Sequence, residues 1–194
     1  MTVEQLRPRT DETLAWGHRY AMVPPTHFRV DYAINPFMDP SQQPDAARAA
    51  QQWEVLAYTL RALGARVDLL PARSDSPDMT FAMNLGLVVG DRVLMSHMRF
   101  AERRLEGETA APALDGLGFE PVWTGRGGIG GFFESGDAFP WRGDLVVGFG
   151  KRSDEVGLKN VAAELGVRVH GLRIVHPSMY HLDLAFCPLD ERRA

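Results

Sequence analysis

The residues with the clearest chemical potential are acids, amides and one histidine that recur at the starts of predicted strands. Asn84, Asp137 and His181 stand at equivalent points of three similar stretches, and Glu134 lies shortly before Asp137. Histidine transfers protons near neutral pH because its ordinary pKa is about 6.5, and neighbouring carboxylates suit it for general acid–base work. The alternative interpretation is that acids and amides at strand starts only cap turns.

Other polar residues lie where the same stretches are expected to converge. Asn35 occurs in the segment Ile34-Asn35-Pro36, and Asp78 precedes the strand that contains Asn84. Arg99 follows a predicted hairpin and could hold a substrate carboxylate through two parallel hydrogen bonds. The alternative for Arg99 is a solvated surface position.

Two further motifs point away from chemistry. Cys187 lies among apolar residues of a predicted strand, so we expect it to pack as a small hydrophobe rather than act as a nucleophile. The run 125–130 matches the spaced glycines of a dinucleotide-binding loop, but residues 131–136 do not begin the required helix. A loop near the site is the favoured interpretation. No histidine pair has the spacing of a zinc motif, so we expect neither a metal nor a cofactor.

The elements that must position these residues follow from apolar spacing and turn residues. Asp45 begins a predicted helix whose apolar residues recur every three or four positions up to Gly64. Ser153 caps a second predicted helix that ends at Gly166, and 114–117 is a weaker helical piece. The predicted strands are Phe28–Tyr32, Ala65–Leu70, Met83–Val89, Arg92–His97, Phe119–Trp123, Asp137–Trp141, Asp144–Phe149, Val167–Leu172 and His181–Leu189.

These elements repeat. Leucine-glycine pairs that end at Gly64, Gly118 and Gly166 each follow a helix and precede a strand, and the glycines are 54 and 48 residues apart. A period near 50 residues is typical of propeller-like or other repeat architectures. We therefore expect one α/β domain over residues 20–194, preceded by a loose polar arm at 1–19. The third copy lacks the hairpin partner that the first two possess.

The composition and net charge of the chain exclude some classes of function. The chain has 194 residues, 45% of them hydrophobic and 24% charged, which is globular composition. The net charge of -4 argues against nucleic acid and anionic membranes as partners, because both select basic patches. No apolar run approaches the length of a membrane span, and no signal peptide is evident, so we expect a cytoplasmic protein.

Five ordered motifs resemble the guanidino-group-modifying superfamily of amidinotransferases, dimethylargininases and arginine dihydrolases. They cover the chain from about Tyr20 to Leu189. One lies at the N-terminal side and combines residues 22–28 with Tyr32-Ala33-Ile34-Asn35-Pro36-Phe37-Met38. The others are the segment 77–88, which contains Asp78 and Asn84, the segment 96–103, Phe133-Glu134-Ser135-Gly136-Asp137 and Tyr180-His181-Leu182-Asp183.

The resemblance implies a fold, a pseudo-five-fold α/β propeller (the pentein fold), and a covalent mechanism. In the family, a cysteine thiolate attacks the guanidinium carbon while a histidine transfers protons. Carried over, His181 would be the acid and base, and Glu134 or Asp137 would bind and polarise the guanidinium. The substrate contacts would be Asn35, Asp78, Asn84 and Arg99.

The sequence departs from the family in three places, one of which is that Glu134 stands three residues before Asp137, where near relatives often have glutamate four before. Val23 stands where many relatives have cysteine, and the glycine-rich motif that carries the family's nucleophile near the C-terminus has no match here. We therefore expect an incomplete propeller that lacks its last blade. The function expected is hydrolysis of a guanidino C–N bond of arginine or a methylated arginine, impaired without the nucleophile. The alternatives are an inactive guanidino-binding protein or a subunit completed by a second chain that supplies the cysteine. The expected partners are a small guanidino substrate and either a second copy of this chain in a homo-oligomer or such a complementing C-terminal chain.

Two geometric expectations follow. The three leucine-glycine helix ends should be repeat copies about a common axis rather than parts of one doubly wound sheet. Asn84, Glu134, Asp137 and His181 should line one cavity.

Overall fold

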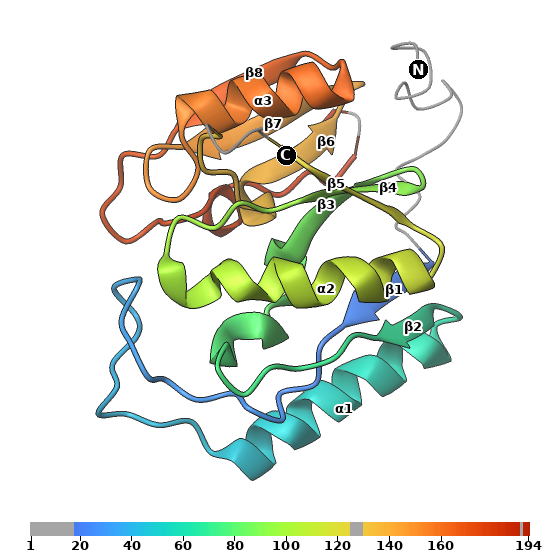
Figure 1. Cartoon of the computed structure of the whole chain (residues 1–194), viewed down its shortest axis with the longest axis vertical. Coiled ribbons are helices and arrows are strands. Elements are labelled where there is room, and N and C mark those ends of the chain that lie inside the picture. Colours follow the sequence, from blue (N-terminus) through green and yellow to red (C-terminus); the bar gives the residue numbers. More distant parts are fainter. Residues whose placement is uncertain (1–17, 125–129, 191) are drawn as a thin grey trace.

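Three small sheets, each with one helix, make up the part of the chain that this computed structural model describes, residues 18–124, 130–190 and 192–194. In each sheet, the helix connects two neighbouring parallel strands. Figure 1 shows the helices at three levels, with α1 at one end of the molecule, α2 in the middle and α3 at the other end. The bounds are β1 (Arg19–Met22), α1 (Ala46–Ala62), β2 (Arg66–Leu69), β3 (Gly86–Val89), β4 (Arg92–Met95), α2 (Arg104–Gly116), β5 (Glu120–Trp123), β6 (Ala138–Trp141), β7 (Asp144–Phe149), α3 (Glu155–Leu165) and β8 (Val169–Arg173).

The second and third sheets have the same topology. Their orders are β3-β4-β5 and β6-β7-β8, with an antiparallel hairpin followed by a parallel pair. The first sheet has only the parallel pair β1 and β2. We refer to residues 18–70, 77–123 and 135–173 as the first, second and third units. Three separate sheets, rather than one continuous doubly wound sheet, agree with the predicted repeat.

Helix ends follow the predicted signals. The side chain of Asp45 accepts a hydrogen bond from the backbone amide of Arg48 at 3.0 Å, as an N-cap residue does. Gly64, Gly118 and Gly166 all have positive φ angles, of 88°, 90° and 66°. Glycine enters this region without steric cost, so each leucine-glycine pair ends its helix.

Two predicted helix features are wrong. The cap of α3 is Asp154, whose side chain accepts from the Gly157 amide at 2.8 Å, while Ser153 bonds elsewhere. The weak helical piece at 114–117 is the end of α2, a helix of 13 residues. The sequence pattern did not predict the whole of α2, because the helix contains Gly107 and Pro112, and both residue types disfavour helix interiors.

Two predicted strands are also absent. At Phe28–Tyr32 the amide and carbonyl of Val30 bond to the side chain of Gln43, so this backbone does not join a sheet. The first strand is instead β1. His181 precedes the short 3-10 helix η6 (Leu182–Leu184) and does not start a strand.

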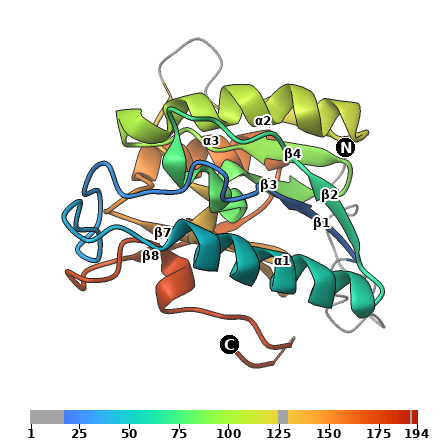
Figure 2. The same ribbon diagram turned by 90° about the horizontal axis from the view of Figure 1, so that it is seen from below.

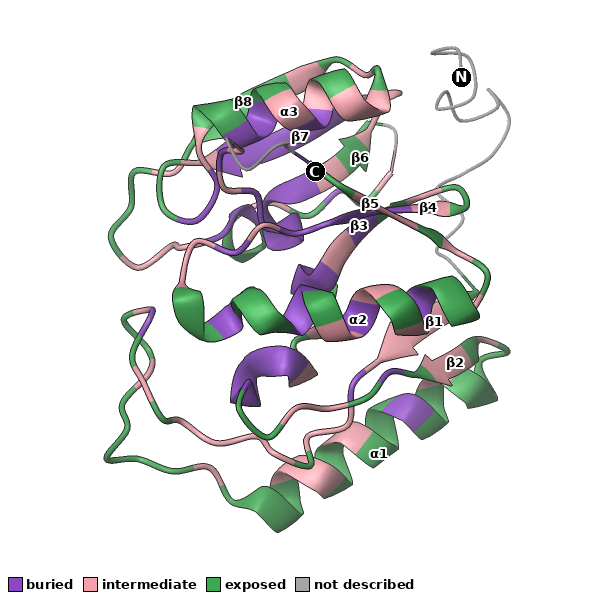
Figure 3. Ribbon diagram, in the orientation of Figure 1, coloured by how far each residue is buried: buried purple, intermediate pink, exposed green. Residues whose placement is uncertain are grey.

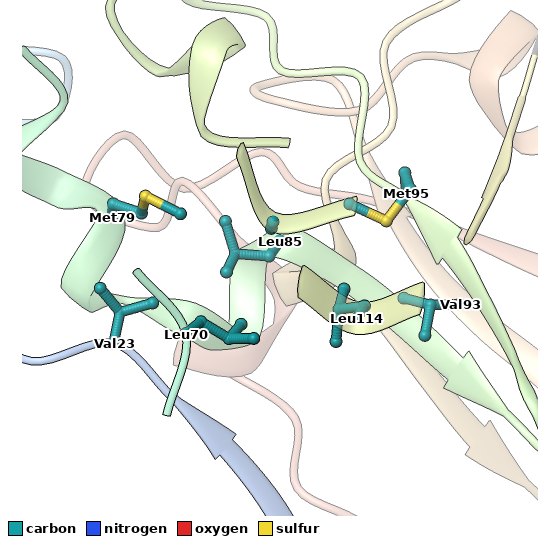
Figure 4. Packing of buried hydrophobic residues seen from close by; sticks show 8 residues of the cluster. Val23, Leu70, Met79, Leu85, Val93, Met95 and Leu114 are labelled. Atoms are coloured by element: carbon teal, nitrogen blue, oxygen red, sulfur yellow. The ribbon is translucent and has the colours of Figure 1, made fainter. Parts of the chain in front are cut away.

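Buried apolar residues form two cores, one between each pair of neighbouring units. The first core joins the first and second units, and Figure 4 shows its side chains converging from both. The second core joins the second and third units. Its buried members are Leu87, Leu94, Phe133, Ala138, Leu145, Val147, Leu158 and Val161.

Helix α1 departs from this packing. Only Ala57 of α1 is buried, and Leu56 and Leu63, both on the predicted apolar face, are 53% and 77% exposed. Figure 3 shows α1 mostly exposed, and Figure 2 shows it in front of the sheets in the view from below. The predicted apolar face of this helix is therefore only partly covered.

Candidate functional site

A pocket of about 840 Å³ is lined by residues of three short 3-10 helices. These helices are η2 (Pro77–Thr80), η3 (Ala82–Leu85) and η6. The loop 28–42 forms the opposite wall. The wall carries both signs of charge, from the side chains of Asp39, Asp78, Arg103, Arg152, His181 and Asp183, together with Asn35, Asn84 and Tyr180.

His181 stands at this wall with a carboxylate behind it. Its Nε2 atom lies 2.8 Å from Oε2 of Glu134, and both residues are at most 2% exposed. The same Oε2 accepts from Nη1 of Arg152 at 2.9 Å, and Oε1 accepts from the Arg99 amide at 3.1 Å. Glu134 is therefore occupied by protein donors, and its role in this geometry is to orient His181.

The surroundings of Glu134 keep it ionised. Burial raises its pKa, but the hydrogen bond with His181 and the charges of Arg152, His181 and Arg103 outweigh burial and lower the pKa to about 2. An ionised Glu134 accepts the Nε2 proton of His181. The Nδ1 atom of the neutral imidazole is then the nitrogen with a free lone pair.

We expect the folded state to lose stability as the pH falls from about 4.5 towards 2. A carboxylate whose pKa is lower in the folded state stabilises that state above its ordinary pKa, here 4.5, and the stabilisation is lost as the pH drops through the folded value. The pKa difference of Glu134 corresponds to about 3 kcal/mol. The measurement is urea unfolding between pH 6 and pH 2.5.

The comparison is between Glu134→Gln and Glu120→Gln. The Glu120 side chain is 69% exposed, so its variant should keep the full acid-dependent loss. Glu134→Gln should be less stable than the unchanged protein at pH 6 and should lose less on acidification. Parallel curves for the two variants would contradict the assignment.

Asp137 connects the third unit to the turn that carries His181. Its Oδ1 accepts from the Leu182 amide at 2.9 Å, and its Oδ2 accepts from the hydroxyl and amide of Ser153 at 2.6 and 3.2 Å. The Ser153 hydroxyl in turn accepts from the Glu134 amide at 3.0 Å. Burial raises the pKa of Asp137 to about 6, against the charge of His181 and these hydrogen bonds. Asp137 thus braces the histidine turn and does not reach the pocket wall.

Asn84 makes the corresponding connection one unit earlier. Its Oδ1 accepts from the Gly136 amide at 3.0 Å, as Oδ1 of Asp137 accepts from the Leu182 amide. Gly136 is required here, because a Cβ atom would overlap Asn84 and approach Nδ1 of His181 to 3.2 Å. Each of these Asx side chains therefore fixes the turn of the following unit.

Asp78 lies beside a buried ion pair. Arg103 donates to both carboxylate oxygens of Glu106 at 2.8 Å and to the Asp78 carbonyl at 3.3 Å. Burial raises the pKa of Asp78, and the positive charge of Arg103 opposes the rise. The Asp78 carboxyl group, 4% exposed, lines the pocket next to Arg103.

The predicted site residues are therefore distributed over three places. Asn35, Asp78, Asn84 and His181 line the pocket, and Glu134 and Asp137 lie behind its wall. The side chain of Asn35 accepts from the Phe37 amide at 2.9 Å, which is a turn-capping contact. Arg99 is not among the lining residues. Its Nε donates to the Arg152 carbonyl at 3.1 Å and its guanidinium lies 4.8 Å from the Phe132 ring centroid.

Two other predictions concern residues away from the pocket. Cys187 is exposed and does not line it. Of the glycine-rich run at 125–130, residues 125–129 lie outside the described residues. Within the described residues, no group of three or more His, Cys, Asp or Glu side chains could hold a metal ion, and no helix is long and apolar enough to cross a membrane.

Sequence reasoning missed Arg103, Arg152 and Asp183 as site residues. Arg103 directly precedes α2, and Arg152 stands two residues before Asp154, the capping residue of α3, so an arginine at a strand-to-helix junction recurs in two units. That recurrence could have identified Arg103 and Arg152 as candidate site residues from the sequence. Asp183 follows His181 by two residues, and burial raises the pKa of its carboxyl group.

Comparisons with known proteins identify relatives of this chain. No protein-family model matches the chain. The chain is 38% identical over 173 residues to the N(G),N(G)-dimethylarginine dimethylaminohydrolase of Mycobacterium tuberculosis, a match that covers 89% of this chain and 56% of that protein. It is 35% identical over 174 residues to the bifunctional arginine dihydrolase/ornithine cyclodeaminase AgrE of a Nostoc species, over 88% of this chain and 24% of AgrE.

Solved structures of related proteins also match this chain. The N-terminal domain of the cyanobacterial arginine dihydrolase ArgZ, a cysteine-to-serine mutant bound to its substrate, matches with a TM-score of 0.79 at 35% identity. This chain belongs to the guanidino-group-modifying superfamily. A solved structure of DDAH from Pseudomonas aeruginosa shares the fold at 17% identity, with a TM-score of 0.69. The match with the ArgZ domain covers 88% of this chain and 63% of that domain, so this chain spans only part of the length of its relatives.

Proposed function

We propose that this chain forms the guanidinium-binding and proton-transferring part of a hydrolase that cleaves a guanidino C–N bond of arginine or a methylated arginine. The observation that carries the proposal is the Glu134–His181 pair at the wall of a pocket that contains carboxylates and arginines. The relatives named above act on dimethylarginine and arginine.

The charges of the pocket suit a guanidino amino acid. Asp78 and Asp183 are carboxylates that could each accept hydrogen bonds from a guanidinium, a planar group with several N–H donors. Arg103 and Arg152 supply positive charge for the carboxylate at the other end of such a substrate.

His181 fits the role of acid and base. Protonated, it donates a proton to the leaving amine as the C–N bond breaks, and neutral, it accepts a proton from the attacking water. Glu134 is a positioning residue, because it acts through the imidazole and is fully buried behind it.

We propose a covalent route. A thiolate attacks the guanidinium carbon, the C–N bond to the leaving amine breaks as His181 protonates that amine, and a thiouronium remains. Water then adds to the thiouronium carbon, His181 takes a proton, and the C–S bond breaks to release a ureido product and the thiolate. A solved structure of an ArgZ variant contains a covalently bound reaction intermediate. Because Cys187 is exposed and off the pocket, we assign the thiolate to a residue outside these 194.

The test is to separate binding from turnover in the purified chain. We expect calorimetry to detect weak binding of arginine and methylarginine, and weaker binding of citrulline, whose ureido group carries no positive charge. We expect an assay for released amine and ureido product to detect little or no turnover. Robust turnover that disappears in Cys187→Ser would contradict the assignment of the thiolate.

Replacing Asp78 by asparagine should weaken arginine binding by about tenfold or more, because a hydrogen bond between charged groups contributes about 1.5–3 kcal/mol. The matched control is Asp75→Asn, whose carboxylate pairs with Arg73 at the surface and does not line the pocket. Calorimetric titrations of both variants give the measurement. Equal affinities for the two variants would remove Asp78 from the site.

We further propose that the three units are part of a pseudo-five-fold α/β propeller. The repeated topology of the second and third sheets and the ArgZ match support this arrangement. This arrangement supports the alternative in which a second chain completes the protein, rather than the alternative of an inactive binding protein.

A further inference from the structure

Arg152 connects the proton-transferring pair to the opposite wall of the pocket. Its Nη1 atom donates to Oε2 of Glu134 at 2.9 Å, and its Nη2 atom donates to the carbonyl of Ile34, in the loop 28–42, at 3.1 Å. Arg152 also lines the pocket. A guanidinium has five N–H donors, so after these two hydrogen bonds it still has donors for the carboxylate of a bound substrate.

Two aromatic rings lie against this guanidinium. The Cζ atom of Arg152 lies over the ring of Phe100, 4.8 Å from its centroid, and over the ring of Tyr180 at 5.1 Å. Both distances are within the range of a cation–π interaction, about 6 Å, and arginine stacks readily on aromatic faces. Phe100 directly precedes the 3-10 helix η4 (Ala101–Arg103), and Tyr180 directly precedes His181. Segments far apart in the sequence therefore hold the same arginine.

The ring of Tyr180 contacts the histidine as well. Its centroid lies 5.2 Å from that of the His181 imidazole, and the two rings are tilted by 58°. On its other contact, with Phe37 of the loop 28–42, the centroids are 6.4 Å apart. Tyr180 therefore touches both the arginine that pairs with Glu134 and the histidine that Glu134 orients, and all three contacts are made by its ring.

The site needs an arginine that does not turn. A long side chain samples many rotamers unless its surroundings select one. The carboxylate of a substrate and the carboxylate of Glu134 are both anions that accept from guanidinium N–H groups, so they would compete for an arginine that could reorient. Turning towards the substrate would take the Arg152 guanidinium off the two rings. The rings thus favour the one orientation in which different N–H groups face Glu134 and the pocket.

We propose that Tyr180 is a positioning residue of this site, whose ring, with that of Phe100, fixes the Arg152 guanidinium so that one arginine holds Glu134 behind His181 and also receives the substrate carboxylate. The inference rests on the proposed function, because it explains how one arginine serves both groups. Tyr180 acts through Arg152 and His181 and does not transfer a proton itself. Its hydroxyl group has no part in this role.

The first experiment needs no ligand. Side-chain NMR of the whole 194-residue chain at pH 7 reports rotation about the Nε–Cζ bond of Arg152, whose signals are those absent from Arg152→Lys. We expect slow rotation, with separate Nη signals, in the unchanged protein and in Tyr180→Phe, which keeps the ring. Rotation should be at least tenfold faster in Tyr180→Leu. Phe100→Leu, the second variant, should show the same increase, because it removes the other ring.

The second experiment compares two ligands by calorimetry, arginine and agmatine, which is arginine without its carboxylate. Tyr180→Leu should weaken arginine binding by about fivefold, the size of one cation–π contact, and should change agmatine binding by less than about twofold. Tyr180→Phe should bind both ligands normally. Tyr58→Leu is the matched control, because Tyr58 lies on α1, is 72% exposed and does not line the pocket.

Unchanged rotation of the Arg152 guanidinium in Tyr180→Leu would overturn the proposal. So would an equal loss of affinity for arginine and agmatine, which would indicate a general disturbance of the pocket. A Tyr180→Phe variant as impaired as Tyr180→Leu would assign the effect to the hydroxyl group and also contradict the proposal. If the unchanged protein binds neither ligand, the proposed function fails, and the rotation of Arg152 alone then decides whether Tyr180 positions it.

Discussion

Replacing Arg152 by alanine should lower the free energy of unfolding by about 3–5 kcal/mol, the usual cost of leaving a buried charge without its partner. Arg152 is 2% exposed and Glu134 is fully buried, and their atoms are 2.9 Å apart. The guanidinium also donates to the Ile34 carbonyl and lies near the rings of Phe100 and Tyr180. Removal of Arg152 therefore leaves Glu134 with a histidine as its remaining side-chain partner.

Urea unfolding at pH 7 measures this effect, with Arg168→Ala as the control. The Arg168 side chain is 75% exposed and its ion pair with Asp144 is 3.8 Å long, so its loss should change stability by less than about 0.5 kcal/mol. Arg152→Lys should lie between the two, because lysine keeps the charge but cannot make the same divergent contacts. Similar values for the two alanine variants would show that the Arg152 pair does not hold the site together.

The second large effect should come from Gly157→Ala in α3. A Cβ atom at Gly157 would overlap the carbonyl group of Phe132, whose backbone is also held by Asp154 at the helix N-terminus. The obstacle is backbone rather than a flexible side chain, so α3 and the segment before Glu134 must move apart. We expect a loss of at least about 3 kcal/mol, at the upper end of the range for overpacking.

Gly116→Ala is the matched substitution, because Gly116 is also helical and has open space around the added atom. Alanine should stabilise that position by up to about 1 kcal/mol, since glycine is the weaker helix former. Thermal unfolding of the two variants should therefore shift in opposite directions. A neutral Gly157→Ala would mean that α3 is not held against the Phe132 segment as the structure shows.

Local signals in the sequence predicted local structure well. Asp45 and the three glycines after leucine marked helix ends because capping depends on a few neighbouring backbone groups. The four strands of the two hairpins were predicted close to their observed bounds for the same reason. Helix α2 was largely missed because its stability depends on tertiary contacts, including a buried Glu106 that only Arg103 makes tolerable.

The site was predicted less completely than the fold. The repeat brought Asn84, Glu134, Asp137 and His181 into one region, but it could not say which of them face the pocket. That choice depends on side-chain partners from other units, such as Arg152 for Glu134 and Ser153 for Asp137. Such partners are far apart in the sequence, and periodicity carries no information about them.

The connections between units limit how far each unit can be treated as a module. Asn84 of one unit fixes the turn at Gly136 of the next, and Asp137 there fixes the turn that presents His181. The geometry of each of these two turns is thus encoded in the sequence of the unit before it. In a chimera between relatives, a transplanted histidine turn would keep its position only if the preceding unit's Asx residue came with it. The site can therefore be transferred between relatives only as a pair of consecutive turns.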